Sequence, residues 1–78
     1  MYEDIDTWLR AEAKRRKIHA QIHMKQGELK SGWLYIPVYI EEGDAYDKAS
    51  RLQDLEDSWN DREPKPEPKV LLVPAAKS

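Results

Sequence analysis

The sequence contains no cysteine, and this absence excludes two classes of small protein. A chain without thiols cannot be a disulfide-stapled scaffold, and it cannot hold zinc through thiolates. The absence also fits a reducing compartment, so we expect a cytoplasmic protein.

Long apolar runs are missing as well. No stretch approaches the ~20 apolar residues that a membrane-spanning helix needs. The chain opens with Tyr2, Glu3 and Asp4 rather than with a basic region and an apolar run. We therefore expect no targeting segment and no membrane partner.

Glycine is scarce, and the candidate catalytic residues lack the partner residues that catalysis requires. Gly27, Gly32 and Gly43 are the only glycines, and they form neither a phosphate-binding loop nor a dinucleotide fingerprint. Thr7 and Ser31 have no evident base and orienting partner. The sequence predicts a protein that binds without catalysing and that uses no cofactor.

What remains is a highly charged chain of a length that suits one small domain. Its 78 residues are 40% hydrophobic and 36% charged, which allows a core under a heavily solvated surface. Residues 1–40 carry seven Lys and Arg against five Asp and Glu, whereas residues 41–78 carry six against ten. We expect an α+β binding domain over residues 1–62 and a Pro-rich spacer with a C-terminal apolar strand over residues 63–78. A core this small would gain stability from a partner or from a homodimer.

The N-terminal third changes from a helical period to a period of two. Ile5, Trp8 and Leu9 fall on one face of a helix predicted over residues 5–16. Residues 18–25 then alternate strictly, with Ile18, Ala20, Ile22 and Met24 set against His19, Gln21, His23 and Lys25. This alternation predicts a half-buried strand. The alternative is a helix that continues to residue 26, because the same apolar residues are also spaced four apart.

Residues 33–40 form the clearest strand. Its two faces are Leu34, Ile36, Val38, Ile40 and Trp33, Tyr35, Pro37, Tyr39. Pro37 has no N–H for a ladder, so we expect this strand at a sheet edge or with that position turned away from its neighbour. With a polar loop between Gly27 and Gly32, pairing 25 with 33 and 18 with 40 sets Ile22 opposite Ile36 and makes each core pair aliphatic.

A second helix and a tail complete the chain. Asp44 is the expected N-cap of a helix whose stripe is Ala45, Ala49, Leu52, Leu55 and Trp59, and the prolines beyond Arg62 end it. Val70, Leu71, Leu72 and Val73 are expected to pair as a strand, either beside residues 18–25 or on a second molecule.

The predicted fold class is α+β, in the order α-β-β-α with a short C-terminal strand and with both helices on one face of an antiparallel hairpin or sheet. This order resembles in outline that of double-stranded RNA-binding domains, but their third central strand and their basic helix start are not evident here.

Two binding hypotheses follow. The first is nucleic-acid binding, DNA or RNA, through cations and aromatic rings, with the candidate residues Lys14, Arg15, Arg16, Lys17, His19, His23, Lys25, Trp33, Tyr35 and Tyr39. Cations that complement the end of a helix are the alternative explanation of the first four. The second hypothesis is a protein-interaction regulator or inhibitor that contacts its partner through the acidic second helix and through Val70, Leu71, Leu72 and Val73.

A metal site is not expected. His19 and His23 could share an ion only if their segment were helical, because on a strand they would lie about 13 Å apart.

Overall fold

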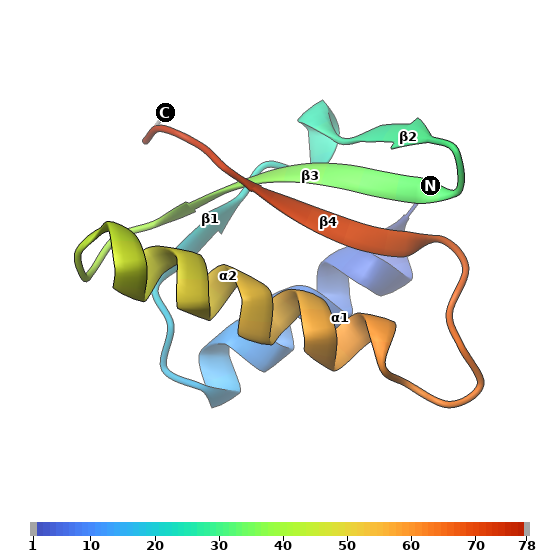
Figure 1. Cartoon of the computed structure of the whole chain (residues 1–78), viewed down its shortest axis with the longest axis horizontal. Helices are drawn as coiled ribbons and strands as arrows, with labels where there is room; N and C mark the ends of the chain where they lie inside the picture. The colour runs from blue at the N-terminus through green and yellow to red at the C-terminus, as the bar shows by residue number, and fades with distance from the viewer. Residues whose placement is uncertain (1, 78) are drawn as a thin grey trace.

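The computed structural model of the chain describes residues 2–77, which form a sheet with two helices packed on one of its faces (Figure 1). The elements are α1 (Glu3–Arg15), β1 (Ala20–Ile22), the 3-10 turn η1 (Met24–Gln26), β2 (Glu28–Lys30), β3 (Trp33–Ile40), α2 (Ala45–Asn60) and β4 (Lys69–Pro74). The predicted α+β class and the placement of both helices on one sheet face are confirmed, and the predicted order of elements broadly matches, with β2 as an additional strand. Neither helix in the described part of the chain is long and apolar enough to cross a bilayer.

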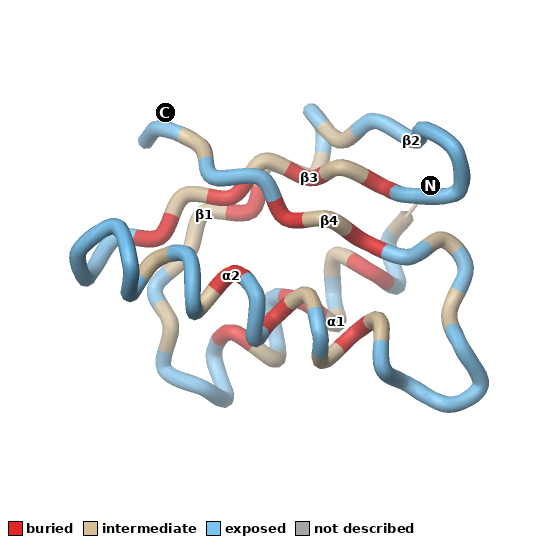
Figure 2. Tube along the Cα trace, viewed as in Figure 1, coloured by how far each residue is buried: buried red, intermediate tan, exposed pale blue. Residues whose placement is uncertain are grey.

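β3 is the central strand and supplies the middle of the core. Leu34, Ile36, Val38 and Ile40 are each at most 3% exposed, because they face the two helices. Ile5 and Leu9 of α1 and Leu52, Leu55 and Trp59 of α2 pack against the same side of the sheet. Buried and half-buried positions therefore alternate along β3 (Figure 2).

α1 ends at Arg15 because the next residues form a Schellman turn. Lys17 takes a left-handed backbone with φ of 58°. The N–H groups of Ile18 and Lys17 donate to the carbonyls of Ala13 and Lys14 at 2.8 and 3.0 Å. The helical alternative for residues 18–26 is therefore wrong.

The predicted strand over residues 18–25 is only partly correct, and Pro37 explains why. β1 ends at Ile22, and the N–H of His23 donates to the Pro37 carbonyl at 2.9 Å. In an unbroken antiparallel ladder the residue at 37 would return a bond to the carbonyl of His23, but proline has no N–H. That carbonyl accepts instead from the N–H of Gln26 at 3.0 Å, which closes η1. β3 is thus not at the edge that Pro37 suggested, because its partner leaves the ladder at that position.

The predicted register is wrong by two residues. Ile22 lies opposite Val38 rather than Ile36, and Ala20 lies opposite Ile40. The expected polar loop contains β2, which reaches β3 through a two-residue turn at Ser31 and Gly32, with φ of 51° and 82°. A slip of two residues keeps each side chain on its face, so the apolar pattern alone does not detect it. β1 and β2 both pair with the same edge of β3, so that edge is covered by two short strands, and the third strand between the helices that the sequence did not make evident is β2.

α2 begins where the sequence predicts. The Asp44 carboxylate accepts the N–H of Asp47 at 2.8 Å, which confirms the N-cap. The predicted apolar stripe is buried only in its second part, because Ala45 and Ala49 are exposed. At the other end of the helix the Arg62 guanidinium lies 4.4 Å from the centre of the Trp59 ring.

The expected partner of the C-terminal strand is wrong. β4 pairs with β3, parallel to it, with Leu34 opposite Val70 and Ile36 opposite Leu72. Pro37 turns its nitrogen toward the β1 side, so the opposite edge of β3 keeps its full set of donors and acceptors. The crossover through α2 delivers the chain to that edge.

The outer edge of β4 is covered by side chains of α2. Asn60 accepts the N–H of Val70 at 2.8 Å and donates to its carbonyl at 2.9 Å. Glu56 accepts the N–H of Leu72 at 2.8 Å. Burial raises the pKa of the Glu56 carboxyl, and the Leu72 N–H partly opposes that rise. A strand added by another molecule would have to displace these contacts first.

Candidate functional site

The sheet face opposite the helices, here called the open face, carries the odd-numbered residues of β3. These are Trp33, Tyr35, Pro37 and Tyr39, and no helix covers them (Figure 1). Trp33 is 37% exposed, and the other three are half-buried by their neighbours on the sheet. The predicted aromatic residues are therefore together on one accessible surface.

The Trp33 end of the open face is basic. Lys30 of β2 and Lys69 of β4 are the cross-strand partners of Trp33 on its two sides. The Lys69 amine lies 5.5 Å from the centre of the Trp33 ring, within the range of a cation–π contact. Glu28 follows opposite Tyr35 and pairs with Lys30 at 3.2 Å, a surface ion pair of small energetic weight.

The middle of the open face is apolar and its far end is polar. Leu71 lies opposite Tyr35, and Val73 lies opposite Pro37. Gln21 of β1 lies opposite Tyr39, and the Lys48 amine of α2 lies 5.3 Å from the centre of the Tyr39 ring. An apolar centre with a lysine at a ring on each end suits flat, anionic ligands with faces that stack.

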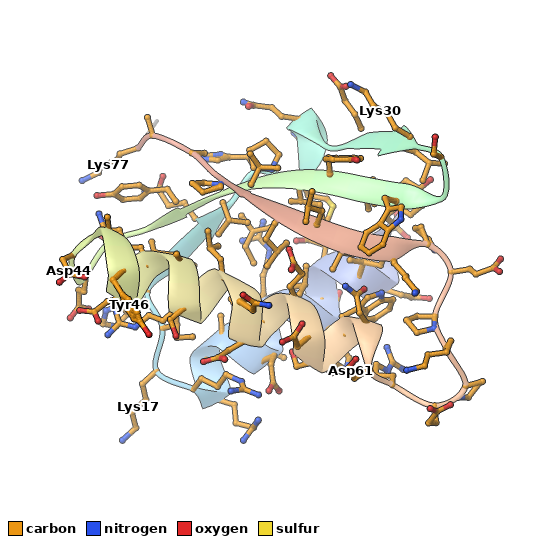
Figure 3. All side chains as sticks on the ribbon, in the orientation of Figure 1. Lys17, Lys30, Asp44, Tyr46, Asp61 and Lys77 are labelled. Carbon is orange, nitrogen blue, oxygen red and sulfur yellow. The ribbon has the colours of Figure 1, made fainter. Side chains whose placement is uncertain are left out.

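The predicted basic cluster lies elsewhere. Lys14 and Arg15 end α1 on the helical side of the sheet, and Figure 3 shows Lys17 pointing away from the sheet, below both helices. The carboxylate of Glu12 accepts from Arg15 at 3.0 Å and from Arg16 at 2.8 Å. Two of the four predicted cations are thus paired within the chain, and none of the four lies beside the aromatic rings.

This cluster gives a pH-dependent contribution to stability. Hydrogen bonds from Arg15 and then Arg16 lower the pKa of the Glu12 carboxyl from 4.5 to about 2. A lowered pKa in the folded state contributes stability that is present above the unfolded pKa and lost as the pH falls toward the folded pKa. We expect Glu12→Gln to lower the melting temperature slightly at pH 6, and the difference from the parent chain to shrink between pH 4.5 and pH 2. Thermal unfolding followed by circular dichroism tests this, and a difference independent of pH would contradict it.

The remaining predicted basic residues are spread around the β1 end of the sheet. His19 hydrogen-bonds through Nδ1 to Glu42 in the turn before α2. His23 is half-buried beside Pro37, and Lys25 is exposed on η1. Within residues 2–77, no three His, Cys, Asp or Glu side chains gather as they would around a metal ion.

The C-terminal residues proposed for protein contact are divided between two faces. Val70 and Leu72 are buried in the core at 0% and 5% exposure. Leu71 and Val73 lie on the open face instead. Half of this segment is therefore structural, and the other half adds to the aromatic surface.

Sequence reasoning missed Lys48, Lys69 and Leu71 as parts of this surface. The alternation of Lys69, Leu71 and Val73 with Val70 and Leu72 contains a signal for a two-faced strand. The sequence did not indicate that this strand pairs with β3, because the parallel pairing joins segments about 35 residues apart in the chain.

Comparisons with protein-family models, with curated proteins and with solved structures found no match to this chain.

Proposed function

We propose that the chain is a small, non-catalytic module that binds single-stranded nucleic acid on the open face, in the cytoplasm. The observation that carries the proposal is the row formed by Trp33, Tyr35 and Tyr39, with a lysine amine beside the first and last rings. Each base of a single strand has a flat face that stacks on an aromatic side chain. The phosphates of the strand need nearby cations.

A single strand fits this surface better than a duplex. The major groove of a duplex admits a helix or a two-stranded ribbon, whereas the open face belongs to a four-stranded sheet without a helix on that side. Bases in a duplex are already stacked on one another, so rings on a sheet reach them only where they are unpaired.

Charge supports the proposal locally, although the whole chain has a net charge of −2. Lys30, Lys48 and Lys69 lie on or beside the open face together with one carboxylate, Glu28, whereas the Asp residues of α2 lie on the helical side. Three phosphate contacts to a single strand predict a slope of about −2 when the logarithm of the association constant is plotted against that of the salt concentration. The proposal assigns binding to the open face and leaves Lys14 to Lys17 outside it.

Fluorescence anisotropy with labelled 12-nucleotide strands tests the proposal. We expect a mixed single strand to bind more tightly than the duplex of the same sequence, with the salt slope given above. DNA and RNA strands measured side by side identify the preferred sugar. Equal binding of duplex and single strand, or no salt dependence, would overturn the proposal.

A second candidate function is a protein contact on the same face. The apolar centre of Pro37, Leu71 and Val73 favours it, because Tyr and Trp around an apolar patch are also typical of protein interfaces. The acidic outer side of α2, with the exposed Tyr46, supplies a further surface for a regulator or inhibitor. Association with a protein partner that does not weaken as salt is added would support this function, since burial of apolar area is not weakened by ionic screening. A second copy of the chain is one such partner, and sedimentation would detect it.

A further inference from the structure

A hollow adjoins the open face at its Trp33 end. Its volume is about 620 Å³, which lies in the range of small-molecule sites. It lies between the turn at Ser31 and Gly32 and the loop that leads from α2 into β4. Its apolar lining consists of Leu29, Trp33, Pro66 and Pro68.

Two lysines add positive charge to this apolar hollow. Lys65 and Lys69 both line it, and Glu67 is the carboxylate among its lining residues. Lys65 is 3.8 Å from Glu63 in an exposed pair, which water and salt weaken. Leu29 is 54% exposed, so the hollow presents a large apolar residue that is about half accessible.

The hollow is also placed at the end of the aromatic row. β3 begins at Trp33, and the loop before β4 passes this end of the sheet (Figure 1). A strand lying along Tyr39, Tyr35 and Trp33 would therefore reach the hollow with its last nucleotide.

We propose that this hollow binds the terminal nucleotide of a single strand together with a terminal phosphate, an inference that rests on the proposed function. The base packs against Trp33, and the phosphate lies near Lys65 and Lys69, which both line the hollow. A terminal phosphate carries close to two negative charges near neutral pH, whereas a phosphate within the strand carries one. Two lysines in the lining of one hollow favour the more highly charged group.

The experiment compares one 12-nucleotide sequence in three forms, with a 5′ phosphate, with a 3′ phosphate and with neither. We expect one phosphorylated form to bind about tenfold more tightly than the unphosphorylated strand. Lys65→Ala should remove that preference, because Lys65 lines the hollow and is not on the aromatic row. Lys14→Ala, a matched exposed lysine on α1, should keep it.

The outcomes separate this inference from the function on which it rests. Equal affinity for the three strands, with binding still dependent on Tyr35, overturns the terminal-phosphate site and leaves the open face intact. A preference that persists in Lys65→Ala also overturns the site. No binding to any of the three strands overturns both proposals. Circular dichroism of each variant verifies its fold.

Discussion

A chain that ends at Arg62 is expected to lose most of its folding stability. Removing residues 63–78 removes Val70 and Leu72, which are 0% and 5% exposed. Burial of side chains of this size contributes about 1.5–3 kcal/mol each, and small domains are stable by only about 5–15 kcal/mol. The truncation also leaves Asn60, Glu56 and the Trp59 indole without their backbone partners in the tail. Urea unfolding followed by circular dichroism should show a mostly unfolded chain or a much lower midpoint.

Point variants separate the contribution of packing from that of chain length. Leu72→Ala should cost about 2–5 kcal/mol, because it opens a cavity in the core. Val73→Ala, at the neighbouring position with 37% exposure, should cost less than about 1 kcal/mol. A truncated chain with the midpoint of the full chain would show that the tail does not complete the core. A melting temperature that rises with protein concentration in the full chain would indicate that β4 is exchanged between copies.

The second large effect is expected on binding. Tyr35→Ala should weaken single-strand binding by about 1–3 kcal/mol, which is about 5- to 150-fold in Kd. Trp33→Ala should have an effect of the same size, because its ring is the most exposed on the row and lies between two cross-strand lysines. Both side chains lie on the side of β3 that faces away from the core, so the fold should persist.

Tyr46→Ala is the matched control for these variants. Tyr46 is 73% exposed on α2, outside the open face (Figure 3). Its removal should leave binding unchanged, and an equal loss in Tyr46→Ala and Tyr35→Ala would mean that the rings of β3 have no special role.

The local features of the fold could be predicted from the sequence. Asp44 caps α2, since a short acidic side chain before a helical stretch has one clear function. The alternation of β3 assigned Leu34 and Ile36 to the core and Trp33 and Tyr35 to the other face, because strand periodicity depends only on the residue order.

The features that depend on distant segments could not be predicted in the same way. Pro37 indicated a break in a ladder, but not that its partner strand would stop at Ile22 and close a turn instead. Lys69 becomes part of the site only because β4 crosses to the free edge of β3. The basic cluster at Lys14 to Lys17 was visible in the sequence, but its separation from the rings depends on how α1 packs under the sheet.

The most direct test of the central claim is a titration of ¹⁵N-labelled protein with a single-stranded oligonucleotide, followed by amide chemical shifts. If the open face is the binding surface, the largest chemical-shift changes should occur in β3 and β4, around Trp33, Tyr35 and Lys69. These changes should decrease as salt is added. Changes concentrated at Lys14 to Lys17, with β3 unaffected, would contradict the account.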